Sequence, residues 1–194
     1  MELTIKPEGG NALSARLLGS GSRACGIERW DVKTLADPGA NSINFTPKDR
    51  TVPTLRAIAP PNFAPDLGRQ PPERVVYRVK ARLVAFKIEA DSDVHLVVAD
   101  PSVQNATMIV EFPAESCDVS ASEERRVAMA AAREALVSAC GRPGEVGFRR
   151  LEGTATITGV AFFDRIHGQN GVAPNGIELH PALRFQSSDC RSVG

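Results

Sequence analysis

Residues 74–88 decide the fold and read Arg-Val-Val-Tyr-Arg-Val-Lys-Ala-Arg-Leu-Val-Ala-Phe-Lys-Ile. From Tyr77 to Leu83, apolar residues alternate with arginine and lysine, which is the period of a half-buried β-strand. After Leu83 the phase moves by one residue, so that the apolar set becomes the even-numbered positions. A one-residue shift inside a strand of this length predicts a bulge or a sharp coil, as at the corner of a small barrel.

Two further strands are expected after tight turns. Residues 94–98 alternate, with Val94, Leu96 and Val98 on the inward face and His95 on the other. Residues 107–112 alternate in the same way, and Glu111 lies on the face opposite the methionine and phenylalanine. Each segment therefore predicts a strand with one face toward a core.

A helix is expected over residues 123–139, which are rich in alanine and other strong helix formers. Ser120 and Glu123 have the spacing of a capping box, which predicts that Ser120 caps the helix. Gly141 and Pro143 follow the last apolar position and predict the helix end.

Two more strands are expected beyond the helix. Residues 154–163 form a fourth apolar run, in which Gly159 indicates a bulge. Pro181 interrupts the fifth strand and indicates an edge or a bulge, because proline cannot donate a ladder hydrogen bond. The apolar face of this fifth strand is predicted to hold Ile177, Leu179, Leu183 and Phe185, with Glu178, His180 and Arg184 facing away.

The order is therefore three strands, a helix and two strands, and the first strand is long and bent. This is the order of the OB-fold, a five-stranded, partly open Greek-key barrel. We expect a mainly β protein with an OB-like barrel over residues 73–187 and one helix between strands 3 and 4. Residues 1–72, rich in turn formers, are expected to be a loop-rich extension packed on the core, and residues 188–194 a tail.

Charge and hydropathy exclude some partners. The chain has 194 residues with 23 basic and 23 acidic side chains, so its formal net charge is zero. This balance argues against a partner that engages the whole surface electrostatically, such as duplex DNA or an anionic membrane. No apolar run is long enough to span a bilayer, and residues 1–10 lack the pattern of a signal peptide.

Four cysteines allow two disulfides in three pairings. No two of them have the short spacing of a zinc knuckle or a redox motif. Paired and free buried thiols both stay open at this point, as does the pairing. The cysteines are Cys25, Cys117, Cys140 and Cys190.

Residues 167–181 match every fixed position of the motif His-Gly-Gln-x-Gly-x-Ala-Pro-Asn-x-Ile-Glu-Leu-His-Pro. With residues 28–35 and 91–98, this stretch resembles a group of bacterial proteins of unknown function. The resemblance covers most of residues 25–186 and implies no activity. Members of this group often look exported, which implies disulfides and favours an exported over a cytoplasmic protein.

Histidines and carboxylates around the motif are candidates for chemistry. His95, Asp164, Glu178 and His180 offer imidazole and carboxylate groups, which suit zinc or another divalent metal. Glu178 and His180 are two residues apart on one strand and so share a face. The alternative is that these side chains, with His167, hydrogen-bond to hold the glycine-rich loop on the barrel.

Asp91 and Asp93 in the first hairpin are similar to the calcium-binding turn of the staphylococcal-nuclease family, which is also an OB-fold. The resemblance implies a metal-dependent phosphodiester hydrolase, with Glu111 and Arg82 as companions. The chain departs from that family in its third strand and the loop that follows. Asp is also favoured in tight turns for conformational reasons alone.

The function we expect is binding rather than catalysis, at the loop His167–Gly176 and the outer face of the last strand. An OB-like binding module could take a single-stranded nucleic acid, a glycan or a protein, with basic side chains along a phosphate backbone. The alternatives are the phosphodiester hydrolase and a structural or interaction protein of the cell envelope. The candidate ligand-binding residues are His167, Gln169, Asn170, Asn175, Arg78, Lys80 and Arg82.

Overall fold

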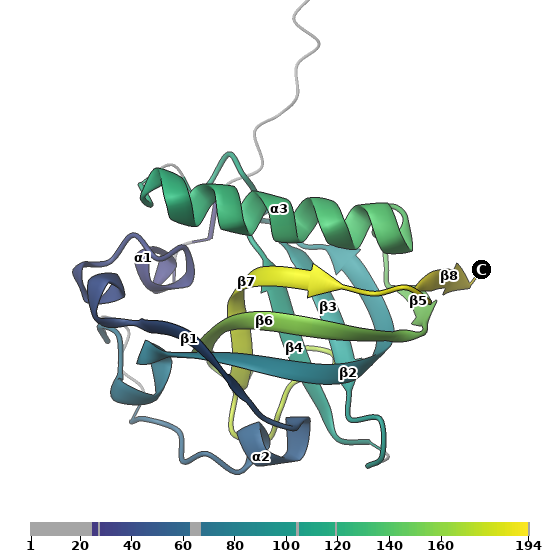
Figure 1. Ribbon diagram of the computed structural model, residues 1–194, viewed down its shortest axis with the longest axis horizontal. Coiled ribbons are helices and arrows are strands. Elements are labelled where there is room, and N and C mark those ends of the chain that lie inside the picture. The colour runs from purple at the N-terminus through teal and green to yellow at the C-terminus, as the bar shows by residue number, and fades with distance from the viewer. Residues whose placement is uncertain (1–24, 27, 63–66, 104, 119, 194) are drawn as a thin grey trace, which may run out of the picture.

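The computed structural model describes residues 25–26, 28–62, 67–103, 105–118 and 120–193. Five strands close a barrel: β2 (Val75–Ile88), β3 (Val94–Ala99), β4 (Thr107–Phe112), β6 (Thr154–Phe163) and β7 (Ile177–Gln186). β2 pairs with β6 along its first half and with β3 along its second half, and parallel pairing of β4 with β7 closes the ring. The predicted OB-like barrel is confirmed (Figure 1).

The bend in β2 lies where the phase of the sequence shifts. Pairing of β2 with β3 slips between Leu83 and Ala85, so one long strand can serve both sides of the barrel. The bulge predicted at Gly159 is confirmed, since its pairing with β7 is irregular on both sides. A Cβ atom at Gly159 would lie 2.9 Å from the Leu179 Cβ atom and from the Pro181 carbonyl oxygen, so the two backbones approach closely here.

The phase of β7 changes at the bulge opposite Gly159, and the sequence prediction for this strand is wrong at one residue. Ala182 and Phe185 join the main core with Leu179. Leu183 instead packs against a smaller cluster on the outside of the barrel. The register shifts twice, on either side of the Gly159–Ala182 pair. The first shift turns Ala182 inward instead of Leu183, and the second returns Phe185 to the core, which a strict two-residue period does not anticipate.

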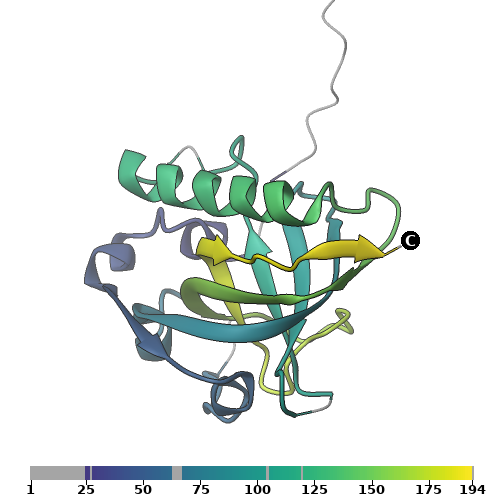
Figure 2. The same cartoon turned by 45° about the vertical axis from the view of Figure 1, so that its right-hand side comes forward.

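Helices close the two ends of the barrel (Figures 1 and 2). α3 (Glu123–Cys140) covers one end and contributes Ala132 and Leu136 to the core, in the place predicted between strands 3 and 4. Its predicted capping box is wrong, because the helix begins after Ser122, whose side chain makes no cap hydrogen bond. α2 (Val52–Arg56) closes the opposite end, where its two buried apolar residues enter the same core.

Short elements surround the barrel. The extension before it contains α1 (Trp30–Lys33), the 3-10 helices η1 (Pro38–Ser42) and η2 (Pro71–Arg74), α2, and β1 (Asn44–Asp49). β1 pairs in parallel with β2, whereas β5 (Arg149–Glu152) and β8 (Arg191–Val193) pair with one another beside the far half of β2. The sequence did not predict β1, β5 or β8, since they are short and lack alternation.

Two disulfides join distant parts of the chain. Cys25 is bonded to Cys117, and Cys140 is bonded to Cys190. The first bond fixes residues 25–26 and 28–35, here called the strap, to the segment that follows β4. The second joins the end of α3 to the segment before β8. No helix in the described part of the chain is long and apolar enough to cross a membrane.

Candidate functional site

Three charged side chains form a row across the outer face of β3, β4 and β7. His95 and Glu111 are register partners in the antiparallel β3–β4 pair. The parallel β4–β7 register pairs Ile109 with Glu178, and continuing it by two residues places His180 beside Glu111. Because strand side chains alternate between faces, the row lies opposite the side chains that fill the barrel.

The loop between β6 and β7 covers this face. Its base is closed by a hydrogen bond from the Asp164 amide to the Gly176 carbonyl oxygen. Gly171 has φ +83°, and a Cβ atom there would lie 2.4 Å from a methyl carbon of Val97 on β3. Glycine therefore satisfies both the backbone conformation and the close contact that bring the loop down onto the strand.

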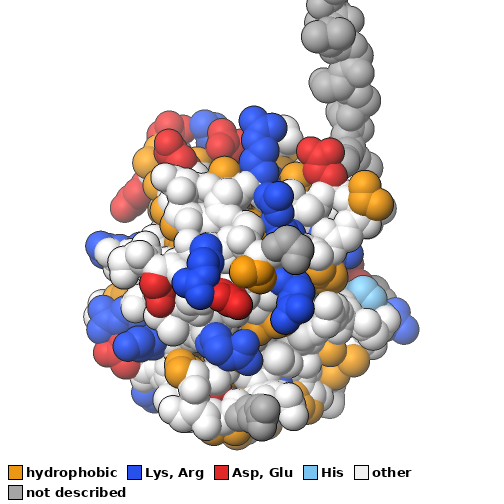
Figure 3. All heavy atoms as spheres, turned by 90° about the vertical axis from the view of Figure 1, so that its right-hand side faces the viewer, with side chains coloured by type: hydrophobic (Ala, Val, Ile, Leu, Met, Phe, Trp, Pro, Cys, Tyr) orange, Lys and Arg blue, Asp and Glu red, His pale blue; other side chains and the backbone are white. Residues whose placement is uncertain are grey.

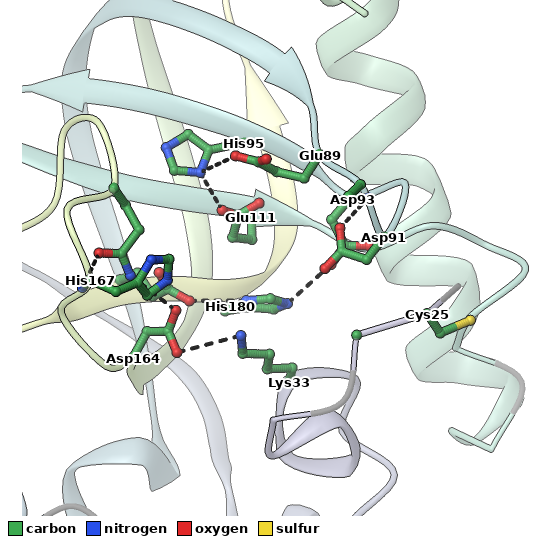
Figure 4. Close-up of a pocket in the computed structure, with 14 residues that line it drawn as sticks. Cys25, Lys33, Glu89, Asp91, Asp93, His95, Glu111, Asp164, His167 and His180 are labelled. Atoms are coloured by element: carbon green, nitrogen blue, oxygen red, sulfur yellow. Dashed lines mark hydrogen bonds and ion pairs between the residues drawn. The ribbon is translucent and has the colours of Figure 1, made fainter. Parts of the chain in front are cut away.

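A cavity of about 470 Å³ lies between the outer face, the loop and the strap (Figure 4). Its size is that of a small-molecule site. Most of the residues singled out in the sequence for catalysis or metal binding converge on it, although they come from separate segments. It is lined by Cys25, Gly26, Lys33, Glu89, Ala90, Asp91, Asp93, His95, Glu111, Asp164, His167, Gln169, Glu178 and His180.

His95 is buried and bonded at both ring nitrogens. Its Nδ1 atom lies 2.7 Å from Glu111 Oε1 and 3.4 Å from Glu89 Oε1, and its Nε2 atom lies 2.9 Å from the Asn170 carbonyl oxygen. Burial disfavours the charged imidazolium, but Glu111 and the Asn170 carbonyl outweigh it and raise the pKa of His95 to about 9. A charged His95 donates both protons and fastens the loop to β3.

Glu111 is held less completely than its partner. Its Oε2 atom is buried and has no hydrogen-bond partner among the described residues. Burial raises the pKa of Glu111 to about 7, against the opposing effect of His95. A carboxylate with a raised pKa in a cavity is a marker of functional sites.

His180 lies between two carboxylates. Its Nδ1 atom is 3.0 Å from Glu178 Oε1, and its Nε2 atom is 3.6 Å from Asp93 Oδ2. Burial disfavours the imidazolium, but the nearby Asp93 carboxylate and the hydrogen-bonded Glu178 carboxylate outweigh it and raise the pKa of His180 to about 9. Asp93 is fixed in this position because its Oδ1 atom accepts the Ala114 amide proton.

The strap forms the remaining wall and is held by a buried ion pair. Arg29 donates to both carboxylate oxygens of Glu73, at 2.9 and 2.6 Å, and Glu73 also accepts from the Phe163 amide. This anchor places the Lys33 ammonium 3.5 Å from Asp164 Oδ1 (Figure 4). The strap thus supplies a lysine that reaches the cavity from outside the barrel.

Other residues predicted for ligand binding lie elsewhere. Asn175 is buried and donates to the Leu55 and Ile58 carbonyl oxygens, which ties the loop to the end of α2. Asn170 takes part through its backbone carbonyl, as described above. Arg78 is paired with Asp49 of β1 at 2.6 Å.

The basic row of β2 is separate from the cavity. Arg78 and Lys80 line a shallow depression with residues of β1 and α2, and Arg82 is exposed further along the same strand face. On the face drawn in Figure 3, lysine and arginine side chains lie singly or in small groups, with acidic side chains between them.

The sequence did not indicate Lys33 and Glu89 as site residues. Lys33 lies within residues 28–35, one of the segments on which the expected resemblance to bacterial proteins rests, and this was the available signal. Glu89 immediately precedes the hairpin that contains Asp91, and its side chain lies 3.4 Å from His95. Neither residue has a local pattern that distinguishes it from a solvated surface charge.

The arrangement does not fit a compact metal centre. Within the described ranges, no three His, Cys, Asp or Glu side chains are grouped in a way that could hold a metal ion. His95 uses both ring nitrogens, and His180 uses Nδ1 for Glu178. The carboxylates are distributed around the walls of the cavity rather than directed at one point.

Comparisons with known proteins do not supply a family. No protein-family model and no curated protein matches the chain. A solved structure, a putative aspartyl-tRNA synthetase from Leishmania major Friedlin, is similar with a TM-score of 0.37 and 11% identity. The match covers 74% of this chain and 21% of that protein, so this chain spans about a fifth of its length. A similarity of this size does not assign a function.

Proposed function

We propose that the protein is an OB-type binding module whose ligand is a small polar molecule held in the cavity between the β6–β7 loop and the strap. The observation that carries this proposal is the position of the cavity. OB-folds bind ligands on the face of their second and third strands, between the loops that join strands 1 to 2 and 4 to 5. In this barrel those elements are β3, β4, residues 89–93 and residues 164–176.

The charge of the cavity supports a small ligand over a nucleic acid. Carboxylates outnumber the basic side chains in its walls, and they repel a phosphate backbone. The basic side chains Arg78 and Lys80 line a different depression, and Arg78 is already paired with Asp49. The same repulsion argues against a phosphodiester substrate, so the nuclease-like alternative is not favoured.

The two disulfides support an oxidising compartment. Disulfides persist in exported proteins and are rare in the cytosol. We therefore infer that the module works outside the cytoplasm, where its ligand is encountered. Expression with and without an export signal, followed by thiol labelling of the intact protein, tests this point: free thiols in exported protein contradict it.

Blocking the cavity tests the proposal. Ala90 is exposed at the cavity wall, so Ala90→Trp fills the entrance without altering charge. Ala131→Trp, on the exposed face of α3, is the matched control. A library of amines, amino acids, saccharides and nucleosides is screened by ligand-observed NMR. We expect hits that bind wild type and Ala131→Trp but not Ala90→Trp.

Two results would overturn this function. The first is the absence of any hit that Ala90→Trp abolishes. The second is tight binding of a fluorescent single-stranded oligonucleotide that survives Ala90→Trp but is weakened by Arg78→Ala, with a steep dependence on salt. That result would transfer the function to the basic face of β2.

A further inference from the structure

The cavity is built to hold a positive charge. Six carboxylates line it, those of Glu89, Asp91, Asp93, Glu111, Asp164 and Glu178. The basic groups at its walls are Lys33 and the imidazoles of His95, His167 and His180. Even with all four charged, the six carboxylates outnumber them, so an excess of negative charge remains for a ligand to neutralise.

Two of these carboxylates have a free acceptor atom deep in the wall. Glu111 receives a hydrogen bond from His95 at Oε1, and its Oε2 atom has no partner. Asp93 receives the Ala114 amide at Oδ1, and its Oδ2 atom accepts no hydrogen bond, although it forms an ion pair at 3.6 Å with His180 Nε2, which also has no hydrogen-bond partner. Ionised carboxylates only accept hydrogen bonds, and leaving a buried acceptor unpaired is costly. The complementary partner is a donor that carries positive charge.

Lys33 shows how the cavity treats an ammonium group. Its Nζ atom lies 3.5 Å from Asp164 Oδ1 and 5.2 Å from the centre of the Phe162 ring, a cation–π distance. Burial opposes its charge, but Glu178, Asp164 and Glu111 outweigh burial, and the pKa of Lys33 is raised above its ordinary value. The potential of this wall therefore favours a buried ammonium despite its desolvation.

We propose that the ligand of this cavity is a small organic cation with at least one ammonium group, which donates hydrogen bonds to Glu111 Oε2 and Asp93 Oδ2, the two buried oxygens of the cavity wall that accept none within the described residues. This inference rests on the proposed function and names its ligand class. An ammonium group suits carboxylates on several walls, because each of its protons can reach a different acceptor. A divalent metal instead requires oxygens directed at one point, an arrangement that the described residues do not provide.

Three probes of equal length separate charge from shape. They are 1,4-diaminobutane, 1,4-butanediol and butanedioate, titrated at fixed ionic strength while ¹⁵N-labelled protein is followed by NMR. We expect the diamine to bind at least about tenfold more tightly than the diol, with the dianion weakest, and Ala90→Trp to abolish diamine binding.

Carboxylate variants locate the charge. Glu111→Gln keeps the shape of the side chain and is expected to weaken diamine binding about fivefold to tenfold. Asp164→Asn removes the charge of another, slightly more exposed carboxylate of the cavity and should also weaken diamine binding, so it serves as a second variant should Glu111→Gln fail to fold. Glu152→Gln, whose exposed side chain pairs with Arg191 far from the cavity, is the control and should leave binding unchanged.

The outcomes distinguish this inference from the function on which it rests. The charge inference is overturned if the diol or the dianion binds at least as tightly as the diamine. It is also overturned if the library compounds whose binding Ala90→Trp abolishes are neutral or anionic. Both results leave the proposed binding function intact. Displacement of the diamine by one equivalent of Ca²⁺ or Zn²⁺ also overturns it, in favour of a metal. If no compound of any class binds in a way that Ala90→Trp prevents, both the charge inference and the proposed binding function are overturned.

Discussion

His95 on β3 lies directly opposite Glu111 on β4, with 2.7 Å between His95 Nδ1 and Glu111 Oε1. The other ring nitrogen of His95, Nε2, is hydrogen-bonded to the Asn170 carbonyl oxygen. One side chain therefore joins two barrel strands to the loop that covers them. This three-way contact depends on the charged imidazolium, since only that form donates from both nitrogens.

Stability should fall as the pH rises through 9. His95 and His180 have a folded pKa of about 9, above the ordinary 6.5, so the contribution of each is complete below pH 6.5 and is lost as pH rises through about 9. We expect a loss of at most about 3 kcal/mol per histidine, measured by urea unfolding from pH 6 to 9.5. Glu111, with its pKa raised to about 7 from 4.5, acts in the same direction at lower pH.

The variant His95→Gln isolates one half of this effect. It should flatten the profile between pH 6.5 and 9 by about half, because His180 still titrates. A wild-type free energy of unfolding that is constant across this window would contradict the charged state of both histidines.

Binding of a permanent cation should strengthen with pH. Tetramethylammonium does not titrate, so a change in its affinity reports the protein. Glu111 ionises near pH 7 and then adds negative charge to the cavity wall. The charged or titratable side chains around it in that wall are those of His95, Glu178, His180 and Lys33. Affinity should therefore rise between pH 6 and 8, and Glu111→Gln should remove this rise. An affinity that falls over this range in wild type would be inconsistent with the assigned titration.

Substitution of two loop glycines should have unequal effects. Both have positive φ, +83° at Gly171 and +91° at Gly168, but a Cβ atom at Gly171 meets Val97, whereas one at Gly168 meets no atom within 4 Å. We expect Gly168→Ala to cost about 1 kcal/mol from backbone strain alone, and Gly171→Ala about 2–4 kcal/mol. The double variant Gly171→Ala/Val97→Ala should recover part of that loss in thermal or urea unfolding. Equal costs for the two glycines would show that the loop does not press on β3.

Removal of the Glu73 charge should release the strap. Glu73 is fully buried, and in Glu73→Gln the Arg29 guanidinium lacks its counter-charge, so we expect a loss of about 3–5 kcal/mol. Glu152→Gln breaks an exposed pair and should cost less than about 1 kcal/mol. Urea unfolding measures both, and similar values for the two variants would contradict the role of Glu73 as an anchor.

The two disulfides should differ in what they protect. Cys25→Ser/Cys117→Ser frees one end of the strap, so it should weaken diamine binding. It should also lower the free energy of unfolding by about 2–5 kcal/mol. Cys140→Ser/Cys190→Ser should reduce stability by a similar amount but leave binding of the diamine unchanged, because that bond lies at the end of α3. If diamine binding is lost only in Cys140→Ser/Cys190→Ser, the Cys140–Cys190 bond and not the Cys25–Cys117 bond maintains the cavity.

The barrel could be predicted from the sequence because four of its strands carry a two-residue period, β6 is an apolar run of strand length, and the shift after Leu83 marks the bend. The same period placed His95, Glu111, Glu178 and His180 on outward faces, so their location could be predicted as well. Their burial could not. It is produced by the strap and the β6–β7 loop, whose positions depend on contacts between residues far apart in the chain.

Several features depend on tertiary contacts that leave no local pattern. β1 forms because it pairs in parallel with the edge of β2 that would otherwise be open, although its own side chains are all exposed. Lys33 reaches the cavity because Arg29 binds Glu73, 44 residues away. Leu183 leaves the core because the strand is irregular around Pro181. In each case a long-range pairing, rather than the periodicity, decides the outcome.

The alternation along β3, β4 and β7 separates two sets of side chains that share the same backbone. Leu96, Val110 and Leu179 point inward to the core, while His95 and Glu111 point outward to the cavity. Because the hydrogen-bonded ladder is common to both sets, one can be replaced while the other keeps the barrel folded. The chain is thus a scaffold in which recognition could diversify, in evolution or by engineering, without rebuilding its interior.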